Sequence, residues 1–376
     1  MHIGLNLVYL TPRATGGTET VARELIPELV AAAPEHRFTA FVNRDTIGTP
    51  GPWSDLIDAV EVPVHALNRV QWVRGEQQLL PPLAHRAGID LLHSLANTSP
   101  VWGRFRRVVT IHDLIYHVVP ESRVGLRSRG MRVLVPLAAR RCQRIIVDAA
   151  ATRADLERLV GIAPSRVDVV PLGFGRPGAG IDPMPEAALR ERLGAGERPI
   201  VLSASAKLPH KNLRRLIEAV ALLPAPRPLL VLPGYPTPHE SQLTEHAAQL
   251  GVSGDVKMLG WVSDEELEGL YAAAAAFVFP SLYEGFGLPV LEAMARGVPV
   301  ACSDRGSLAE VSGDAALNFD PESVPAISGA IRTLLQDPAA AERLRELGRA
   351  RAARYTWRAA AEGTLASYER AVRSAS

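Results

Sequence analysis

The sequence predicts an α/β protein made of two doubly wound domains, each built on a parallel sheet. Its 376 residues exceed what one ordinary hydrophobic core holds, so two domains are the natural expectation. Short apolar runs alternate with amphipathic helical segments along the chain, a pattern typical of parallel strands joined by helices. The glycine- and proline-rich stretch 173–196 interrupts this alternation, which then resumes.

The first domain is expected at residues 1–175. Apolar runs in this part have the length and composition of buried strands, and helical segments such as 18–33 and 151–160 separate most of them. The strands that we expect are residues 3–9, 38–43, 59–64, 91–94, 108–112, 145–148 and 167–172.

The second domain is expected at residues 176–356, where the final segment 357–376 follows as an amphipathic helix with Trp357, Leu365 and Tyr368 on its apolar side. The sequence alone allows this helix to pack on either domain. Ligands of doubly wound sheets bind beyond the carboxyl ends of the strands, here expected to face each other across a cleft. The strands expected in the second domain are residues 200–203, 229–232, 256–259, 276–279, 298–302 and 316–319.

Composition excludes several classes of protein. A hydrophobic content of 47% and a charged content of 22% are globular values and argue against disorder. The 41 basic and 40 acidic residues nearly cancel, so bulk nucleic-acid binding has no support. The two cysteines, Cys142 and Cys302, give no disulfide framework and favour a reducing cytoplasm. The chain opens on a strand pattern instead of a signal peptide, and its longest apolar run is far below the ~20 residues that span a bilayer.

The most informative stretch is PSLYEGFGLPVLEAMARGVPVACSD, residues 280–304. An apolar strand precedes this stretch. The stretch itself contains a glycine loop, then a short helix, then a second buried strand. Pro289 suits the first turn of that helix because its missing N–H needs no partner there, and Gly297 suits the C-terminal cap.

This layout has a chemical consequence. The free N–H groups of a glycine loop and of a helix start attract anions, above all phosphate. Glu284 precedes the loop and Glu292 lies inside the helix, although phosphate repels carboxylates. The two glutamates fit such a site if they accept hydrogen bonds from neutral sugar and ribose hydroxyls. The stretch therefore indicates a nucleotide sugar as ligand, and two solvated glutamates on a surface helix are the alternative.

The glutamate pair, followed by GVPV and by SDRGSLAE at residues 303–310, resembles the retaining glycosyltransferases of family 4, which have the GT-B fold. The resemblance implies two Rossmann-like domains, with the acceptor on the first and the donor on the second. It also implies that the final helix 357–376 packs back on the first domain. It assigns ribose to Glu292, and the donor sugar to Glu284 and the N–H groups of the loop that follows, formed by Gly285, Phe286, Gly287 and Leu288.

Two lysines are candidates for binding the donor diphosphate. In SASAKLPHKN, residues 203–212, Lys211 stands at a helix start, where the helix dipole and the ammonium both favour an anion. Family members also carry an arginine after the preceding strand, where this chain has Ser205 and Ala206. We therefore expect Lys207 to supply that charge, although Lys211 is the stronger candidate.

The nucleobase pocket is implied by the resemblance alone. It assigns Gly234 and the backbone around Trp261 and Val262 to this pocket. Ordinary turns between a strand and a helix are the alternative for each of these residues, with Ser263 as a helix cap.

In the first domain, Gly16 and Gly17 follow the first strand and let the backbone bring N–H groups close to a ligand. The resemblance implies that they lie against the donor diphosphate and the acceptor, and an ordinary turn is the alternative. The G-x-G-x-x-G pattern of dinucleotide folds is absent there, which argues against a nicotinamide enzyme. His112 follows a hydrophobic strand, where an imidazole holds a hydroxyl, donates to phosphate or transfers a proton. The resemblance implies that His112 contacts the donor sugar, whereas a purely structural histidine is the alternative.

The expected reaction is transfer of a hexosyl group from a nucleotide sugar to an acceptor hydroxyl, with retention at the anomeric carbon. The sequence has no D-x-D motif and no His/Cys cluster with ligand spacing, so we expect neither a catalytic metal nor another cofactor. The leaving diphosphate would be stabilised by lysine and by helix-start N–H groups. The catalytic candidates are Glu284, His112 and Lys211.

The donor and acceptor are less defined. The segments HKN and SLYEGFG resemble those of mannosyl- and rhamnosyltransferases, so GDP-mannose is the first choice, with dTDP-rhamnose and UDP-hexoses as alternatives. A catalytically silent protein that binds nucleotide sugars is the alternative from another class. The acceptor, a glycolipid, polysaccharide or small metabolite, is expected at the loops 68–76 and 120–132. The arginine-rich segment from Arg123 to Arg144 indicates either a solvated helix face or a patch for an anionic acceptor or the inner face of a membrane.

Overall fold

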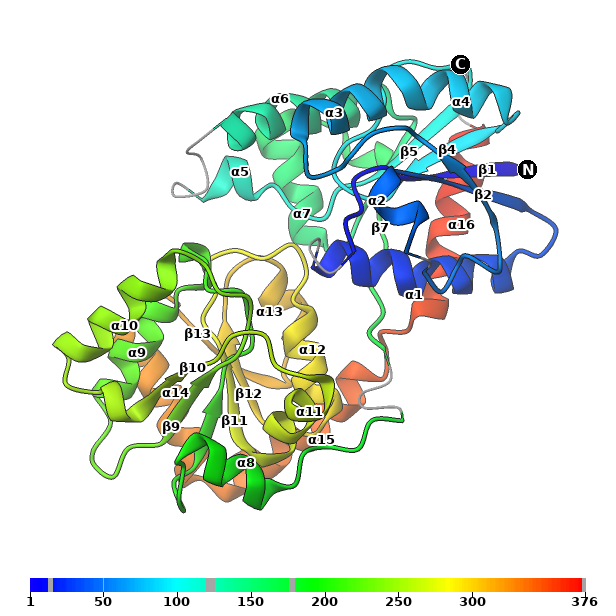
Figure 1. The fold of residues 1–376 in the computed structure, drawn as a ribbon. Helices are drawn as coiled ribbons and strands as arrows, with labels where there is room; N and C mark the ends of the chain where they lie inside the picture. The colour runs from blue at the N-terminus through cyan, green and yellow to red at the C-terminus, as the bar shows by residue number, and fades with distance from the viewer. Residues whose placement is uncertain (13–15, 50, 120–125, 176–179, 374–376) are drawn as a thin grey trace. The chain divides into compact units, whose positions relative to one another are not determined.

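The computed structural model describes residues 1–12, 16–49, 51–119, 126–175 and 180–373 (Figure 1). The chain divides into two compact units. Unit 1 contains Met1–Gly175 and Tyr355–Ser376, and unit 2 contains Arg176–Arg354. Each unit has one parallel sheet with helices packed against it, which confirms the predicted fold class.

Unit 1 contains a seven-stranded sheet in the order β3-β2-β1-β4-β5-β6-β7. The order changes direction between β1 and β4, which are paired through Ile3 with Leu91 and Asn6 with Ser94. Every strand expected in the first domain is present, with ends shifted by a few residues. The strands are β1 (His2–Leu7), β2 (Arg37–Val42), β3 (Asp58–Glu61), β4 (Leu91–Ser94), β5 (Arg106–Thr110), β6 (Arg144–Val147) and β7 (Val167–Val169).

Helices cover both faces of this sheet. A π-helical turn, η1 (Gly75–Leu79), joins α3 to α4, and a second, η3 (Leu156–Val160), continues α7. The helices of unit 1 are α1 (Gly17–Ala32), α2 (Arg44–Ile47), α3 (Arg69–Arg74), α4 (Leu80–Arg86), α5 (Ile115–Val118), α6 (Leu126–Arg141), α7 (Ala150–Asp155) and α16 (Trp357–Arg373), with a 3-10 turn η4 (Pro164–Arg166).

The C-terminal helix α16 belongs to unit 1. Successive side chains of β5 and β6 point to opposite faces. Val109 and Ile145 pack in a cluster with side chains of α6, whereas Thr110 and Ile146 line a small cavity with side chains of α1 and α16. Helix α16 therefore covers the face opposite α6, beside α1 (Figure 1).

The junction before α16 requires a glycine. A Cβ atom on Gly173 would lie 2.2 Å from the backbone N of Trp357, so the two segments touch through their backbones. We expect Gly173→Ala to lower the free energy of unfolding by about 1 to 3 kcal/mol, because the contact has no flexible side chain to move aside. Gly175→Ala is the matched control, since its Cβ would meet no atom within 4 Å. Equal thermal midpoints for the two variants would contradict this packing.

Unit 2 contains a six-stranded sheet in the order β10-β9-β8-β11-β12-β13. Its direction changes between β8 and β11, where Val201 pairs with Ala276 and Leu202 with Phe277. The strands expected from the sequence are again all present. They are β8 (Ile200–Leu202), β9 (Leu229–Leu232), β10 (Val256–Met258), β11 (Ala274–Phe279), β12 (Val300–Ser303) and β13 (Ala316–Phe319).

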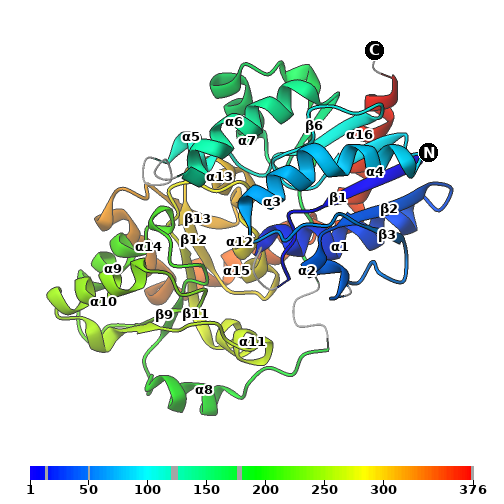
Figure 2. The same ribbon diagram turned by 45° about the horizontal axis from the view of Figure 1, so that its top comes forward.

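One face of this sheet packs against α9, α10 and α14, and α9 and α14 lie side by side (Figure 2). Leu216, Ile217 and Ile331 of these helices are fully buried against Val201 and Val278 of the strands. No helix among the described residues is long and apolar enough to cross a membrane. The helices of unit 2 are α8 (Glu186–Leu193), α9 (Leu213–Ala221), α10 (His239–Gln249), α11 (Asp264–Ala273), α12 (Leu288–Ala295), α13 (Ser307–Ser312), α14 (Val324–Gln336) and α15 (Pro338–Ala352), with 3-10 turns η5 (Pro209–Lys211) and η6 (Ser253–Asp255).

Candidate functional site

The candidate donor site of unit 2 lies at the carboxyl ends of β8 and β11. These strands are the neighbours at which the strand order changes direction, the position where doubly wound sheets bind ligands. Lys211 follows β8 and Glu284 follows β11. Lys211 Nζ donates to Glu284 Oε1 at 2.6 Å, and the two side chains are 16% and 14% exposed. The structure thus brings two of the predicted catalytic residues into direct contact at this edge.

Asn212 fixes the backbone that carries Lys211. It is buried and left-handed, with φ 58° and ψ 29°, a conformation that asparagine adopts more readily than most residues. Its side-chain amide donates to the backbone oxygens of Pro280, at 3.0 Å, and Pro321, at 2.7 Å. Lys211 Nζ also lies 5.2 Å from the centre of the Phe279 ring. The ammonium is therefore held at the end of β11 by contacts that the Lys-Asn motif alone does not reveal.

The glycine loop and α12 form as the sequence predicts. Pro289 lies in the first turn of α12, and Gly287 is the N-cap with φ 117°. A Cβ atom on Gly287 would also lie 2.7 Å from Leu308 Cδ2, so both conformation and space require glycine. Ser307 Oγ donates to the backbone oxygen of Glu284 at 2.8 Å. The loop is therefore fixed. In the first turn of α12, Pro289 has no N–H and Val290 N donates to the backbone oxygen of Gly287 at 3.0 Å, so the donors expected for an anion are those of the loop and of Leu288.

The remaining residues of the predicted donor loop differ in exposure. Phe286 is buried, whereas Gly285 and Leu288 are partly exposed. The aromatic side chain of Phe286 is therefore part of the packing, and its contribution to a ligand would come from the backbone.

Glu292 lies on α12 and is partly buried. Its Oε2 accepts a hydrogen bond from the Tyr271 hydroxyl at 3.3 Å. Burial raises the pKa of Glu292, and the nearby Arg296 guanidinium opposes this effect. Arg296 pairs with Glu268 and lies 4.5 Å from the centre of the Tyr271 ring. The carboxylate keeps capacity to accept further hydrogen bonds, as ribose recognition requires.

Lys207 is placed differently from the sequence prediction. Its side chain has 0% exposure, and Nζ donates to the backbone oxygens of Gly234, at 3.0 Å, and Leu259, at 2.5 Å. Nζ also lies 3.3 Å from Glu240 Oε2. Burial lowers the pKa of Lys207, and the Glu240 carboxylate opposes this. The Lys207 ammonium is therefore bound by groups of the protein itself, and its side chain has no exposed surface that a diphosphate could contact.

The segments predicted for the nucleobase are adjacent, because β9 and β10 are paired. Gly234 has φ 144°, and a Cβ atom there would lie 2.0 Å from the backbone oxygen of Ser205, so no other residue fits. Its N–H donates to the backbone oxygen of Gly260 at 3.1 Å. Trp261 is 76% exposed and Val262 is partly exposed.

His112 follows β5 in unit 1, and both of its ring nitrogens have protein partners. Nδ1 lies 2.7 Å from Asp148 Oδ2, and Nε2 lies 2.8 Å from the backbone oxygen of Leu95. A carbonyl oxygen only accepts, so Nε2 carries a proton. Burial lowers the pKa of His112, but the Asp148 carboxylate outweighs it, and the pKa is raised to about 9. His112 is therefore an imidazolium at neutral pH, fixed by Asp148.

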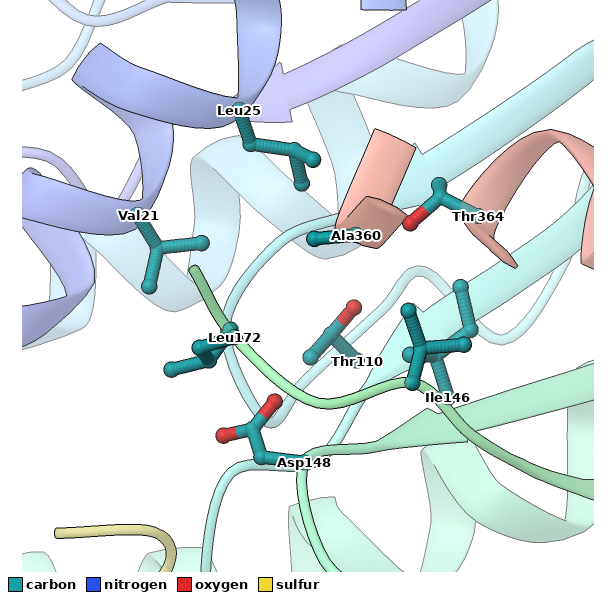
Figure 3. Close-up of a pocket in the computed structure, with 9 residues that line it drawn as sticks. Val21, Leu25, Thr110, Ile146, Asp148, Leu172, Ala360 and Thr364 are labelled. Carbon is teal, nitrogen blue, oxygen red and sulfur yellow. The ribbon is translucent and has the colours of Figure 1, made fainter. Parts of the chain in front are cut away.

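Asp148 is one of the residues that line a small cavity (Figure 3). Asp148 Oδ1 is buried and has no hydrogen-bond partner among the described residues. The cavity has a volume of about 10 Å³, which is about the space that one water molecule needs. Thr110 and Thr364 line it with their hydroxyl-bearing side chains, Thr364 from α16.

Hydrogen bonds also connect Thr110, beside Asp148, to the C-terminal helix through His93. His93 Nε2 lies 2.8 Å from Thr110 Oγ1, and His93 Nδ1 lies 2.7 Å from the hydroxyl of Tyr368 on α16. Burial lowers the pKa of His93 to about 3, so this ring is neutral. The sequence did not single out Asp148 or His93; the signal for Asp148 was its place at the end of the strand that neighbours β5.

Comparison with known proteins matches both units. Residues 15–174 match the family Glycosyltransferase Family 4, and residues 186–351 match the family Glycosyl transferases group 1. The O-antigen chain mannosyltransferase B of Escherichia coli is 34% identical over 267 residues, which cover 70% of this chain and 70% of that protein. The chain belongs to glycosyltransferase family 4.

Two further comparisons support this family and its fold. The MMP α-(1→4)-mannosyltransferase of Mycolicibacterium hassiacum is 34% identical over 62% of this chain and 56% of that enzyme. The structure of sucrose-phosphate synthase from Thermosynechococcus elongatus has a TM-score of 0.81 and 24% identity, covering 100% of both chains. The latter likeness shows the GT-B fold, as the resemblance predicted.

In this glycosyltransferase the Gly-Gly segment opens α1. Gly16 is the N-cap, with φ 59°, and Gly17 is the first residue of the helix. A Cβ atom on either glycine would meet no atom within 4 Å, so the space beside them is open. The first part of the predicted acceptor loop 120–132 lies outside the described residues.

The arginine-rich segment of the glycosyltransferase divides into exposed and engaged side chains. Arg140 donates to the backbone oxygen of Val160, and Arg144 pairs with Asp168. Arg129 and Arg132 of α6 are exposed, and Arg123 lies outside the described residues. Within the part of the chain that is described, no group of three or more His, Cys, Asp or Glu side chains is placed to hold a metal ion.

A buried carboxyl in the predicted acceptor loop 68–76 was not recognised from the sequence. Glu76, in η1, accepts hydrogen bonds from Asn6 Nδ2, at 3.0 Å, Thr98 Oγ1, at 2.9 Å, and Gln77 Nε2, at 3.0 Å. Burial raises the pKa of Glu76 to about 7, although these three donors oppose the shift. Glu76 thus joins the ends of β1 and β4.

Ionisation of Glu76 is expected to destabilise the glycosyltransferase. A carboxyl with a raised pKa in the folded state gives stability that is complete below pH 4.5 and is lost as the pH rises to about 7. The loss between pH 5 and pH 8 should be about 2 to 3 kcal/mol. Glu76→Gln should remove this part of the pH dependence, measured by urea unfolding at both pH values. An unchanged difference between pH 5 and pH 8 in the variant would contradict it.

Proposed function

We propose that this glycosyltransferase transfers a mannosyl group from GDP-mannose to an acceptor hydroxyl, with retention at the anomeric carbon and without a metal ion. The observation that carries the proposal is the contact between Lys211 and Glu284 beside the glycine loop and the start of α12. The Lys211 ammonium can bind a diphosphate there, and the Glu284 carboxylate can accept hydrogen bonds from sugar hydroxyls. Glu292, on α12, can accept hydrogen bonds from ribose. Mannosyltransferases at 34% identity support mannose as the sugar.

The ion pair suggests how the donor binds. Lys211 and Glu284 form an ion pair. The donor diphosphate attracts the ammonium away from Glu284, and sugar hydroxyls then donate to the freed carboxylate. Because each partner of the pair gains a ligand group, neither charge is left without a partner.

The chemical step needs stabilisation of the leaving group. The bond between the anomeric carbon and the phosphate oxygen breaks, and a bond to the acceptor oxygen forms on the same face of the sugar. The acceptor proton passes to the departing phosphate oxygen. Lys211 and the N–H groups at the start of α12 stabilise the charge that develops on the nucleoside diphosphate. We also propose His112 as a substrate-contacting residue that acts as an imidazolium held by Asp148.

A thermal-shift panel of GDP, UDP, dTDP and ADP tests the donor. A nucleotide that binds only the folded protein raises the thermal midpoint, and at 100 times Kd it adds about 2.7 kcal/mol of stability. We expect the largest shift with GDP. A larger shift with dTDP or UDP would replace GDP-mannose by dTDP-rhamnose or a UDP-hexose, and no shift with any nucleotide would overturn the proposal.

Turnover separates the enzyme from a silent nucleotide-sugar binder. Incubation with GDP-mannose should release GDP slowly by hydrolysis and faster when an acceptor is present. NMR of the product should show the anomeric configuration of the donor, and excess EDTA should leave the rate unchanged. Binding without release of GDP in any acceptor screen would favour the silent binder.

A further inference from the structure

Three loops of unit 2 converge on one buried ammonium, that of Lys207. The loop after β8 carries Lys207 itself, the loop after β9 supplies the backbone oxygen of Gly234, and the loop after β10 supplies that of Leu259. Glu240, on α10, completes the surroundings at 3.3 Å. The ammonium donates to the two backbone oxygens, and the Glu240 carboxylate oxygen lies at ion-pair distance from it.

The loops are also joined directly to one another. Ser205 N donates to the backbone oxygen of Pro233 at 3.1 Å, and Lys207 N donates to that of Tyr235 at 3.4 Å. Thr237 Oγ1 donates to the backbone oxygen of Lys207. The backbone of Gly234 has no room for a Cβ atom, so the loops after β8 and β9 are in contact at that point. The arrangement is a packed unit with the ammonium at its centre.

We infer that Lys207 is a positioning residue whose buried ammonium holds the loops after β8, β9 and β10 in the shape that receives the nucleobase of the donor. This inference rests on the proposed function of unit 2. It replaces the expectation that Lys207 touches the diphosphate, because the side chain has no exposed surface.

The physical reason is the cost of leaving buried acceptors without a donor. Without the ammonium, two carbonyl oxygens and a carboxylate face one another, and each buried acceptor that lacks a hydrogen bond costs about 1 to 3 kcal/mol. The loops would separate or admit water. The same loops carry Tyr235 and Trp261, which are exposed at 57% and 76% and present flat faces for a base. A change in the loops is therefore expected to weaken binding of the base more than binding of the phosphates.

The test compares pyrophosphate with two nucleotides in the full-length protein. Inorganic pyrophosphate reports on the phosphate subsite, and GDP and UDP report on phosphate and base together, all by isothermal titration. Lys207→Met should raise the Kd of GDP by about tenfold or more, which is the scale of a lost hydrogen bond to a charged group. It should also bring the Kd values of GDP and UDP closer together. It should change the Kd of pyrophosphate by no more than about twofold. Lys211→Met, the matched variant, should weaken pyrophosphate and GDP alike.

Two outcomes would overturn the inference. One is loss of pyrophosphate binding in Lys207→Met to the same degree as in Lys211→Met, which would mean direct contact with phosphate. The other is unchanged binding of GDP and unchanged preference between GDP and UDP. If the wild-type protein binds none of these ligands, the proposed function fails instead, so the two failures are distinguishable.

A second variant covers the case in which Lys207→Met does not fold. Glu240→Gln keeps the shape of the side chain and removes only the charge that faces Lys207. Glu240→Gln should raise the Kd of GDP by about threefold and leave the Kd of pyrophosphate unchanged. Lys207→Arg, which keeps a positive charge, should retain part of the preference between GDP and UDP that Lys207→Met loses. Wild-type binding of both nucleotides by Glu240→Gln would contradict the role of the cluster.

Discussion

The Glu284→Gln variant is expected to lower kcat for sugar transfer by about 100-fold or more, the scale of one well-placed polar group in an active site. Glutamine is similar in shape but cannot carry the charge that pairs with Lys211 at 2.6 Å. Its amide nitrogen would also meet the ammonium or the sugar hydroxyls as a donor in place of an acceptor. The measurement is steady-state transfer from the donor that the thermal-shift panel selects.

The control for this variant is Glu322→Gln. Glu322 is an acidic side chain of the same unit, is 62% exposed, and contacts Arg305 at the surface. It should retain wild-type kcat. Both variants should keep the wild-type thermal midpoint within a few degrees, since each glutamate retains some exposure to water. Wild-type turnover by Glu284→Gln would remove this carboxylate from the mechanism.

The Asp148→Asn variant is expected to have the largest effect on stability. The carboxylate faces an imidazolium in the interior, and removing one partner of such a pair costs on the order of 3 kcal/mol. Without the carboxylate the pKa of His112 should fall from about 9, because Asp148 is the main group that opposes the effect of burial. A larger share of His112 would then be neutral at pH 7.

The pH dependence follows from the direction of that shift. A histidine with a raised pKa stabilises the folded state fully below pH 6.5, and this stability is lost as the pH rises through about 9. The wild-type protein should therefore lose stability between these values, and Asp148→Asn should lose less. NMR of labelled histidines gives the pKa of His112, and urea unfolding gives the stability. Asp55→Asn, at an exposed site of unit 1, is the control. An unchanged pKa of His112 in Asp148→Asn would contradict the ion pair.

The parts of this protein that the sequence predicts are those with a repeating or local signal. Apolar runs located the strands, and Pro289 with Gly287 located the start of α12. The placement of Lys211 and Glu284 at one edge was accessible because each follows a central strand, and carboxyl ends of parallel strands share one edge. Their direct ion pair was not predicted. The family was accessible from the same local motifs.

The surroundings of Lys207 and His112 were not accessible in this way. Lys207 is bound by the backbone oxygens of Gly234 and Leu259, which are 27 and 52 residues away along the chain. Every residue has a backbone oxygen, so the sequence does not show which of these oxygens bind the Lys207 ammonium. For His112 the partner Asp148 is distant in sequence, and the choice between a solvated and a buried histidine depends on packing by α1 and α16.

A crystal structure of the full chain with GDP would test the central claim most directly. The account predicts phosphate oxygens within about 3 Å of Lys211 Nζ, the usual length of a charge-assisted hydrogen bond. It further predicts ribose hydroxyls on the Glu292 carboxylate, the base against the loops that carry Tyr235 and Trp261, and Lys207 still bound to Gly234 and Leu259. GDP bound away from Lys211, with the pair of Lys211 and Glu284 intact, would contradict it.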